Sequence, residues 1–145
     1  MASEGNIVTF DASGSSDPDG DSLEYRWDFD SNGVWDTAGS TDPTAQMFYA
    51  DDYIGMVTVE ISDGEETDTD TASIAVNNVV PAVDAGSDQM VDEGSTVPVA
   101  ATFTDPGADT HTAKIHWGDG SPEEVATITG NTVSGSHVYA DNGVY

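Results

Sequence analysis

The amino-acid sequence predicts an all-β fold built from two tandem modules, and three observations support this prediction. Short runs rich in Val, Ile, Thr, Tyr, Phe and Trp are separated by Gly, Asp, Asn, Ser and Pro, a pattern typical of strands joined by turns. No stretch of the 145 residues shows a sustained helical period. In addition, a set of landmark residues occurs twice along the chain.

The landmarks recur in the same order at a nearly constant spacing of about 90 residues, which indicates an internal repeat. The matched pairs are Glu4-Gly5 with Glu93-Gly94, Asp17-Pro18 with Asp105-Pro106, Trp27 with Trp117, and Tyr49-Ala50-Asp51 with Tyr139-Ala140-Asp141. Four ordered matches at this spacing are not expected by chance. The sequence therefore predicts two copies of one module.

The first module begins with an alternating run, and a second run has large apolar residues at every other position. The period of two places one face of each strand in a core and the other face in solvent. The predicted strand residues are Asn6 to Phe10, then Leu23, Tyr25, Trp27 and Phe29, Met47 to Tyr49, Met56 to Ile61, and Ala72, Ile74 and Val76. Glu24, Arg26, Asp28 and Asp30 are expected to face outward.

The second module is expected to follow a linker, Asn77 to Asp92, that also supplies its first strand. Its other predicted strands are Thr96 to Thr102, Ala113 to Trp117, Val125 to Thr129, and Thr132 to Tyr139. The modules then span residues 1–78, without a first strand, and 79–145, truncated at the C-terminal side. Open sheet edges at both ends would invite strand exchange between chains, so a strand-exchanged homo-oligomer is one expected state.

Charge is the most unusual bulk property. Two basic residues, Arg26 and Lys114, stand against 28 acidic residues, which gives a formal net charge of −26. Such a chain repels nucleic acid and anionic membranes, and it repels itself when it compacts. Carboxylate sites for divalent cations and adaptation to a saline habitat both explain this acidity, and the sequence leaves the two explanations open. Cysteine is absent, which excludes disulfides and thiolate zinc sites.

The repeat carries motifs that resemble the PKD domain, a family named after the polycystic kidney disease protein. In the first copy these are the run Phe10 to Asp21 and the segment Tyr25 to Asp30. In the second copy they are His116-Trp117-Gly118-Asp119-Gly120, His137-Val138-Tyr139 and Gly143-Val144-Tyr145. The first copy departs from the pattern, with Asp30-Ser31-Asn32-Gly33 in place of the Gly-Asp-Gly turn and Phe48-Tyr49 in place of His-x-Tyr.

The resemblance implies an immunoglobulin-like β-sandwich with the central tryptophans in its core. It also implies an extracellular location in a secreted or cell-surface protein, often beside proteases, chitinases or adhesin regions. The implied role is that of a spacer or of a module that contacts proteins or carbohydrates. Because fold does not fix function, this role rests on analogy.

The segment Asp28 to Asp36 is a candidate calcium loop. Oxygen donors at alternate positions followed by glycine resemble the start of such a loop, because calcium takes six to eight oxygen ligands. The predicted ligands are Asp28, Asp30, Asn32, the Val34 carbonyl and Asp36. An EF-hand is excluded, since Gly39 stands where its bidentate glutamate would be. An ordinary acidic turn explains the same residues without a metal.

A second candidate cluster is the run that holds Asp17, Asp19 and Asp21, which is read equally well as a Pro-Asp-Gly turn between strands. Some members of the resembled family bind calcium near this loop. The related run Asp105 to Asp109 has fewer carboxylates and is the weaker candidate. The run Gly118 to Ser121 is expected to form a tight hairpin turn.

An enzymatic function is not expected. Carboxylate pairs are unavoidable among 28 acidic residues, and the histidines, His111, His116 and His137, fit structural positions better than catalytic ones. No nucleophile-elbow, phosphate-loop or zinc-protease spacing is present. The expected function is a calcium-stabilised extracellular spacer and interaction module with protein or polysaccharide partners. The alternative is a substrate-binding accessory module of a secreted hydrolase, in which Trp35 and Tyr53 would stack on sugar rings if they were exposed.

Overall fold

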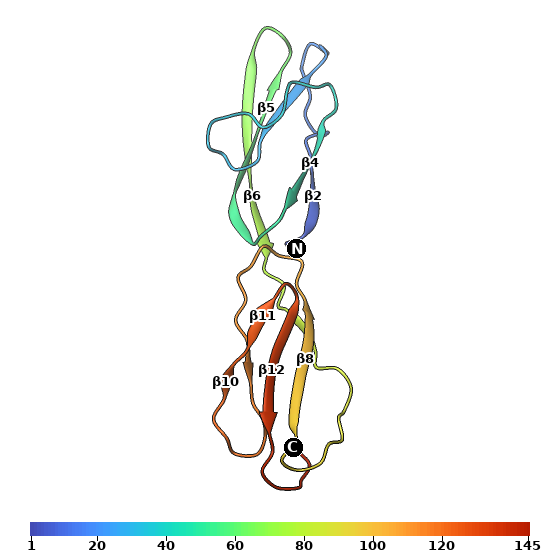
Figure 1. Cartoon of the computed structure of the whole chain (residues 1–145). Coiled ribbons are helices and arrows are strands. Elements are labelled where there is room, and N and C mark those ends of the chain that lie inside the picture. Colours follow the sequence, from blue (N-terminus) through green and yellow to red (C-terminus); the bar gives the residue numbers. More distant parts are fainter. The chain divides into compact units, whose positions relative to one another are not determined.

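A computed structural model describes all residues, 1–145, as an all-β protein with no helix. The chain divides into two compact units, Met1–Val79 with Pro106–Ala108, and Val80–Asp105 with Asp109–Tyr145. Figure 1 shows the strands of both units. The predicted all-β, immunoglobulin-like class is confirmed.

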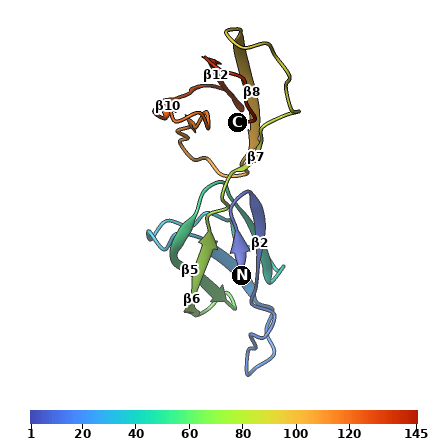
Figure 2. The same cartoon turned by 90° about the horizontal axis from the view of Figure 1, so that it is seen from below.

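The first unit is a sandwich of two sheets. One sheet has the strand order β1-β6-β5-β3, and the other pairs β2 with β4. Figure 2 shows the chain from below, with β2 opposite β5 and β6. The strands are β1 (Ala2–Ser3), β2 (Asn6–Asp11), β3 (Glu24–Asp28), β4 (Thr44–Tyr49), β5 (Tyr53–Ser62) and β6 (Thr67–Asn77).

The core of the first unit consists of the period-two residues of β3 and β5. Tyr25, Trp27 and Phe29 are buried with Val57 and Val59, and Phe10 on the opposite sheet packs against this cluster. The rings of Phe10 and Trp27 lie 5.8 Å apart between centroids. Trp27 is only 6% exposed, which confirms its predicted place between the sheets. Burying large aromatic faces between two sheets is the main source of stability in such a sandwich.

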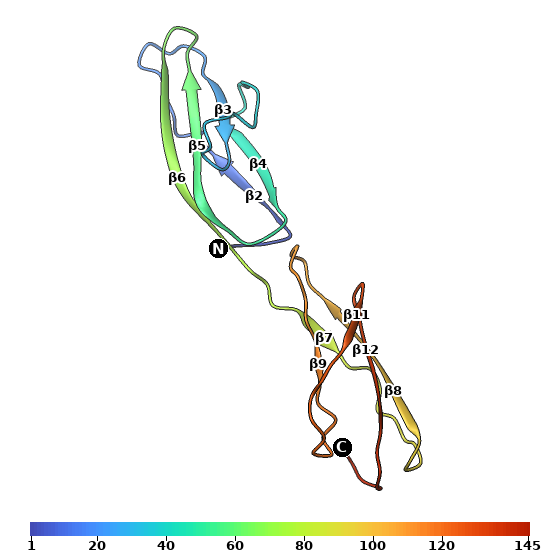
Figure 3. The same cartoon turned by 60° about the vertical axis from the view of Figure 1, so that its left-hand side comes forward.

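The second unit contains β7 (Ala82–Asp84), β8 (Thr96–Thr104), β9 (Lys114–Ile115), β10 (Glu124–Val125), β11 (Thr127–Thr129) and β12 (Thr132–Val138). One sheet has the order β11-β12-β8-β7, and the other is the β9-β10 hairpin. Figure 3 shows these strands from the side. Ala101, Phe103 and Val133 form the centre of its core, and Trp117 is 4% exposed, as predicted.

The two units differ at the strand that should open each module. In the second unit β7 pairs antiparallel with β8, with Val83 opposite Phe103, which confirms that the linker supplies a first strand. In the first unit β2 pairs with β4 alone, so its other edge is free. A groove of about 390 Å³ lies there, lined by residues that include Phe10, Ala12, Gly14, Val57 and Ala72.

A tyrosine and a glycine exchange places between the two copies. The landmark spacing aligns Tyr53 with Gly143 and Gly55 with Tyr145. In each unit the tyrosine side chain covers the glycine, where a Cβ atom would collide with the ring. The same ring also stacks on the landmark tyrosine, with centroids 5.4 Å apart for Tyr53 on Tyr49 and 4.5 Å apart for Tyr145 on Tyr139. One packing arrangement is therefore reached by two sequences.

Candidate cation sites

The loop after β3 is organised around Asp28. Its Oδ1 accepts hydrogen bonds from the backbone N–H groups of Asp30 (3.3 Å) and Asn32 (3.2 Å), and its Oδ2 accepts one from Gly33 (2.8 Å). Asp28 is 3% exposed, so the expectation that it faces solvent is wrong. The reason is that β3 ends at Asp28 and the chain then folds over the carboxylate instead of continuing the outward alternation.

Three of the predicted ligands converge in this loop. One carboxylate oxygen each from Asp28, Asp30 and Asp36 lies within 4.8 Å of the other two. Asn32 belongs to the same network, because its Nδ2 donates to Asp30 Oδ2 (2.9 Å) and its Oδ1 accepts from the backbone N–H of Val34 (2.8 Å). The donor set of hard oxygens is the kind that calcium prefers. The loop therefore gathers several oxygen donors of the kind that a divalent cation takes.

The electrostatics of Asp28 favour its charged form. Burial alone raises the pKa of this carboxyl, because desolvation penalises a charge. The N–H groups of Gly33, Asn32 and Asp30 outweigh that penalty and hold the pKa below its ordinary value. The position of the Asp36 side chain is also fixed, because its Oδ2 accepts a hydrogen bond from the backbone N–H of Phe29 at 2.7 Å. Asp28 is thus held in its charged form, and the positions of both side chains are fixed by hydrogen bonds.

The second predicted cluster has a different organisation. Asp17 Oδ1 accepts the backbone N–H groups of Asp19 (2.7 Å) and Asp21 (3.1 Å), and Gly20 adopts a φ of 84°. These are the features of a turn capped by an aspartate side chain. The carboxylates of Asp17, Asp19 and Asp21 do not form one of the converging groups of three in the structure.

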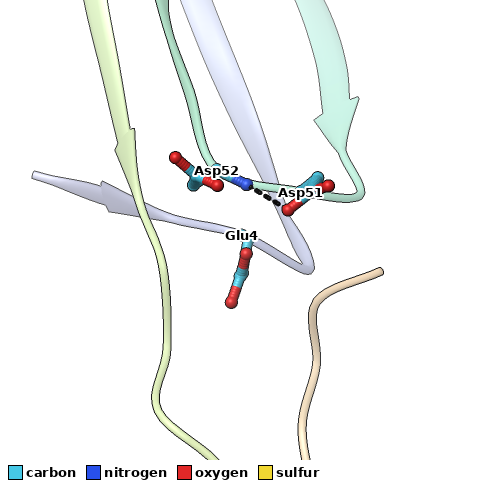
Figure 4. A group of neighbouring side chains, drawn as sticks. All are labelled: Glu4, Asp51 and Asp52. Atoms are coloured by element: carbon cyan, nitrogen blue, oxygen red, sulfur yellow. Dashed lines mark hydrogen bonds between the residues drawn. The ribbon is translucent and has the colours of Figure 1, made fainter. Parts of the chain in front are cut away.

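The structure brings together a further group of carboxylates that the sequence did not predict. Glu4, Asp51 and Asp52 bring one oxygen each to within 4.8 Å of one another. Figure 4 shows Glu4 on the segment after β1, beside the β4–β5 turn that carries the two aspartates. Glu4 and Asp51 both appear among the repeated landmarks, but the repeat gave no sign that they meet in space.

Two of the histidines, His137 and His111, make structural contacts. The ring of His137 stacks on Trp117 at 4.8 Å, and its Nε2 lies 2.7 Å from Asp119 Oδ2. The Ser121 hydroxyl, His137 and the Ser121 N–H together hold the pKa of Asp119 well below its ordinary value. Gly118 and Gly120 adopt positive φ angles beside it, as a tight turn requires. His111 likewise lies 3.0 Å from Asp105.

Trp35 and Tyr53, the aromatic residues considered for sugar stacking, both contact other side chains of the chain. The Arg26 guanidinium lies 4.5 Å from the centroid of the half-buried Trp35 ring, and the Arg26 Nε is 2.6 Å from Glu60. Tyr53 is half-buried and stacks on Tyr49. Each of the two rings therefore already has one face in contact with another side chain.

Comparison with known protein families matches the PKD domain twice, over residues 1–76 and again over residues 78–145. The search of curated proteins and the search of solved structures each found no match. The chain forms no helix with the length and apolar character needed to cross a bilayer. The two family matches cover both copies of the repeat.

Proposed function

This chain belongs to the PKD domain family, and we propose that it is a calcium-stabilised spacer and interaction module of a larger secreted or cell-surface protein. Domains of this family are in general non-catalytic modules of extracellular proteins. The proposal of a calcium site is supported by the convergence of Asp28, Asp30 and Asp36. The Asn32 amide oxygen and the Val34 carbonyl are the further proposed ligands.

Calcium would act on the fold through charge. A net charge of −26 opposes compaction, and three converging carboxylates concentrate that repulsion in one loop. A bound divalent cation replaces repulsion with attraction and fixes the 28–36 loop to the end of β3. Because the unfolded chain does not hold the ligands together, the binding free energy adds to the free energy of unfolding.

The partners that we propose are proteins or polysaccharides of an extracellular assembly. The acidity argues against nucleic acid and anionic lipid as partners. The alternative role, a carbohydrate-binding accessory module, is weakened by the Arg26 side chain over Trp35. Pull-down on insoluble polysaccharide, with Trp35→Ala as the control, separates this alternative from the spacer.

The test of the proposed loop site is calcium titration of the full chain by calorimetry. Asp30→Asn removes one converging carboxylate and is expected to weaken binding at the loop about tenfold or more. Asp19→Asn, an exposed aspartate in the other loop, is the matched control with the same change in charge. Equal calcium binding by both variants and by the unchanged chain would show that this loop is not a calcium site.

A further inference from the structure

Glu4 is a charged side chain with no exposed surface. It lies between β1 and β2, where its backbone N–H donates to the Asn77 carbonyl (3.1 Å). Its side-chain Oε1 accepts the backbone N–H of Val79 (2.6 Å). Its Oε2 is buried and has no hydrogen-bond partner, and the residue as a whole is 0% exposed.

A buried carboxylate oxygen without a partner is costly, because desolvation is not repaid by any donor or counter-charge. The chain has only two basic side chains to offer, and both are engaged elsewhere. Arg26 pairs with Glu60, and Lys114 pairs with Glu123 at 3.2 Å. Instead of a cation, Glu4 has two more carboxylates beside it, Asp51 and Asp52. Neither Arg26 nor Lys114 therefore neutralises the Glu4 carboxylate.

We propose that Glu4, Asp51 and Asp52 bind a calcium ion, separately from the loop around Asp28. An ion placed between three oxygens that all lie within 4.8 Å of one another is at most about 2.8 Å from each, close to the calcium–oxygen distance of about 2.4 Å. Glu4 supplies a ligand from its buried carboxylate, one oxygen of which has no hydrogen-bond partner. Asp51 and Asp52 are exposed, so water completes the six to eight oxygens that calcium takes.

This group needs a cation more than the 28–36 loop does. In that loop both oxygens of the buried Asp28 accept backbone N–H groups, whereas Glu4 Oε2 accepts nothing. The second module lacks the arrangement, because Glu93, which aligns with Glu4, is exposed and Asn142 aligns with Asp52. Glu93 therefore provides a natural control position.

The experiment is a calcium titration of the full chain followed by amide NMR and by thermal unfolding, with Glu4→Gln and the control Glu93→Gln. We expect calcium to shift the Asp51 and Asp52 amides of the unchanged chain and of Glu93→Gln. In Glu4→Gln these shifts should require at least about tenfold more calcium. In chelator, Glu4→Gln should melt no lower than the unchanged chain, because the glutamine still accepts the Val79 N–H and carries no buried charge.

Two results would overturn the site. One is a Glu4→Gln chain whose Asp51 and Asp52 amides respond to calcium as those of the unchanged chain do. The other is an unchanged chain whose Asp51 and Asp52 amides do not respond at all. The amides of residues 28–36 report on the proposed loop site in the same spectra, so the failure of one site is distinguishable from the failure of the other.

Discussion

Two buried carboxylates in the first unit are stabilised in different ways. Asp28 is surrounded by backbone N–H groups of its own loop, which keep it ionised although it is almost fully buried. Glu4 has one N–H donor and one bare oxygen. Because the net cost of a buried charge depends on its partners, Glu4 has a greater need than Asp28 of a partner from outside the chain.

Trp27 should dominate the stability of the first unit. It is 6% exposed and packs against Phe10 and Phe29, so Trp27→Ala should lower the free energy of unfolding by about 3–5 kcal/mol. Trp35→Ala, at a half-buried ring under Arg26, should cost about 0.5–1 kcal/mol. Urea unfolding measures both losses, and equal losses would place Trp27 outside the core.

If Trp27→Ala does not fold at all, Trp27→Phe keeps the comparison quantitative. The indole Nε1 is buried without a hydrogen-bond partner, so phenylalanine removes an unsatisfied polar atom while it keeps an aromatic ring. We expect Trp27→Phe to retain more stability than Trp27→Ala. The opposite order would contradict the packing described here.

Asp119 should make the second unit sensitive to acid. Its pKa in the folded protein lies below the ordinary value of 3.8, chiefly through the Ser121 hydroxyl and then His137. The unfolded chain therefore takes up this proton at a higher pH than the folded protein does. The contribution of Asp119 to stability is present above pH 3.8 and is lost as the pH falls below it.

The measurement is a pH titration of the Asp119 carboxyl carbon by NMR. Ser121→Ala removes the strongest hydrogen bond and should raise the pKa of Asp119 toward its ordinary value. Asp84, an exposed aspartate of β7, serves as an internal reference in the same spectra. If Asp119 titrates at the same pH with and without the Ser121 hydroxyl, the hydrogen-bond explanation is wrong.

At the scale of the elements, the sequence predicts strands where one face is apolar and fails where neither face is. The alternation of β3 and β5 located their cores correctly. The first half of β6, Thr67 to Thr71, is polar on both faces and was not predicted, because its only signal is pairing with β5. Alternation also cannot reveal a change of sheet. The predicted strand Val125 to Thr129 is divided at Ala126 between β10, which pairs with β9, and β11, which pairs with β12.

For the candidate sites too, the sequence predicts what is local and misses what depends on the fold. Local spacing was enough to identify Asp28, Asp30 and Asp36, because one loop holds them all. It gave the wrong orientation for Asp28, since the alternation rule stops applying where the strand ends. The sequence could not predict the Glu4 group, because Glu4 and the two aspartates are almost fifty positions apart. Their proximity depends on how β2 and β4 pair.

The free edge of β2 leads to a prediction about assembly. In the second unit β7 covers the corresponding edge, so we expect β2 of one chain to pair with a second copy of the chain. The large negative charge keeps copies apart at low salt, and added salt screens it. Sedimentation velocity should therefore show dimers that grow with salt concentration.

A charge on the edge strand is the direct control for this assembly. Ile7→Lys on β2 should suppress the dimer, because charged residues on an edge oppose strand pairing. Ile54→Lys, on the inner strand β5, introduces the same charge at another exposed apolar position and should leave the dimer intact. Monomers at every salt concentration would contradict the prediction.

At the scale of the whole molecule, acidity is the property that connects the sites with the fold. Twenty-eight acidic residues against two basic ones cannot be neutralised within the chain. General screening by salt lowers this repulsion everywhere, whereas bound calcium lowers it at particular carboxylates. The two effects differ in their dependence on the identity of the cation, which provides the decisive comparison.

The most direct test is thermal unfolding of the full chain in chelator, in calcium, and in sodium chloride at the same ionic strength as the calcium sample. The proposed sites predict a melting temperature in calcium that is clearly higher than in matched sodium chloride, with chelator lowest. Equal melting temperatures in calcium and in matched sodium chloride would mean that the acidic residues form a solvated surface and hold no specific cation.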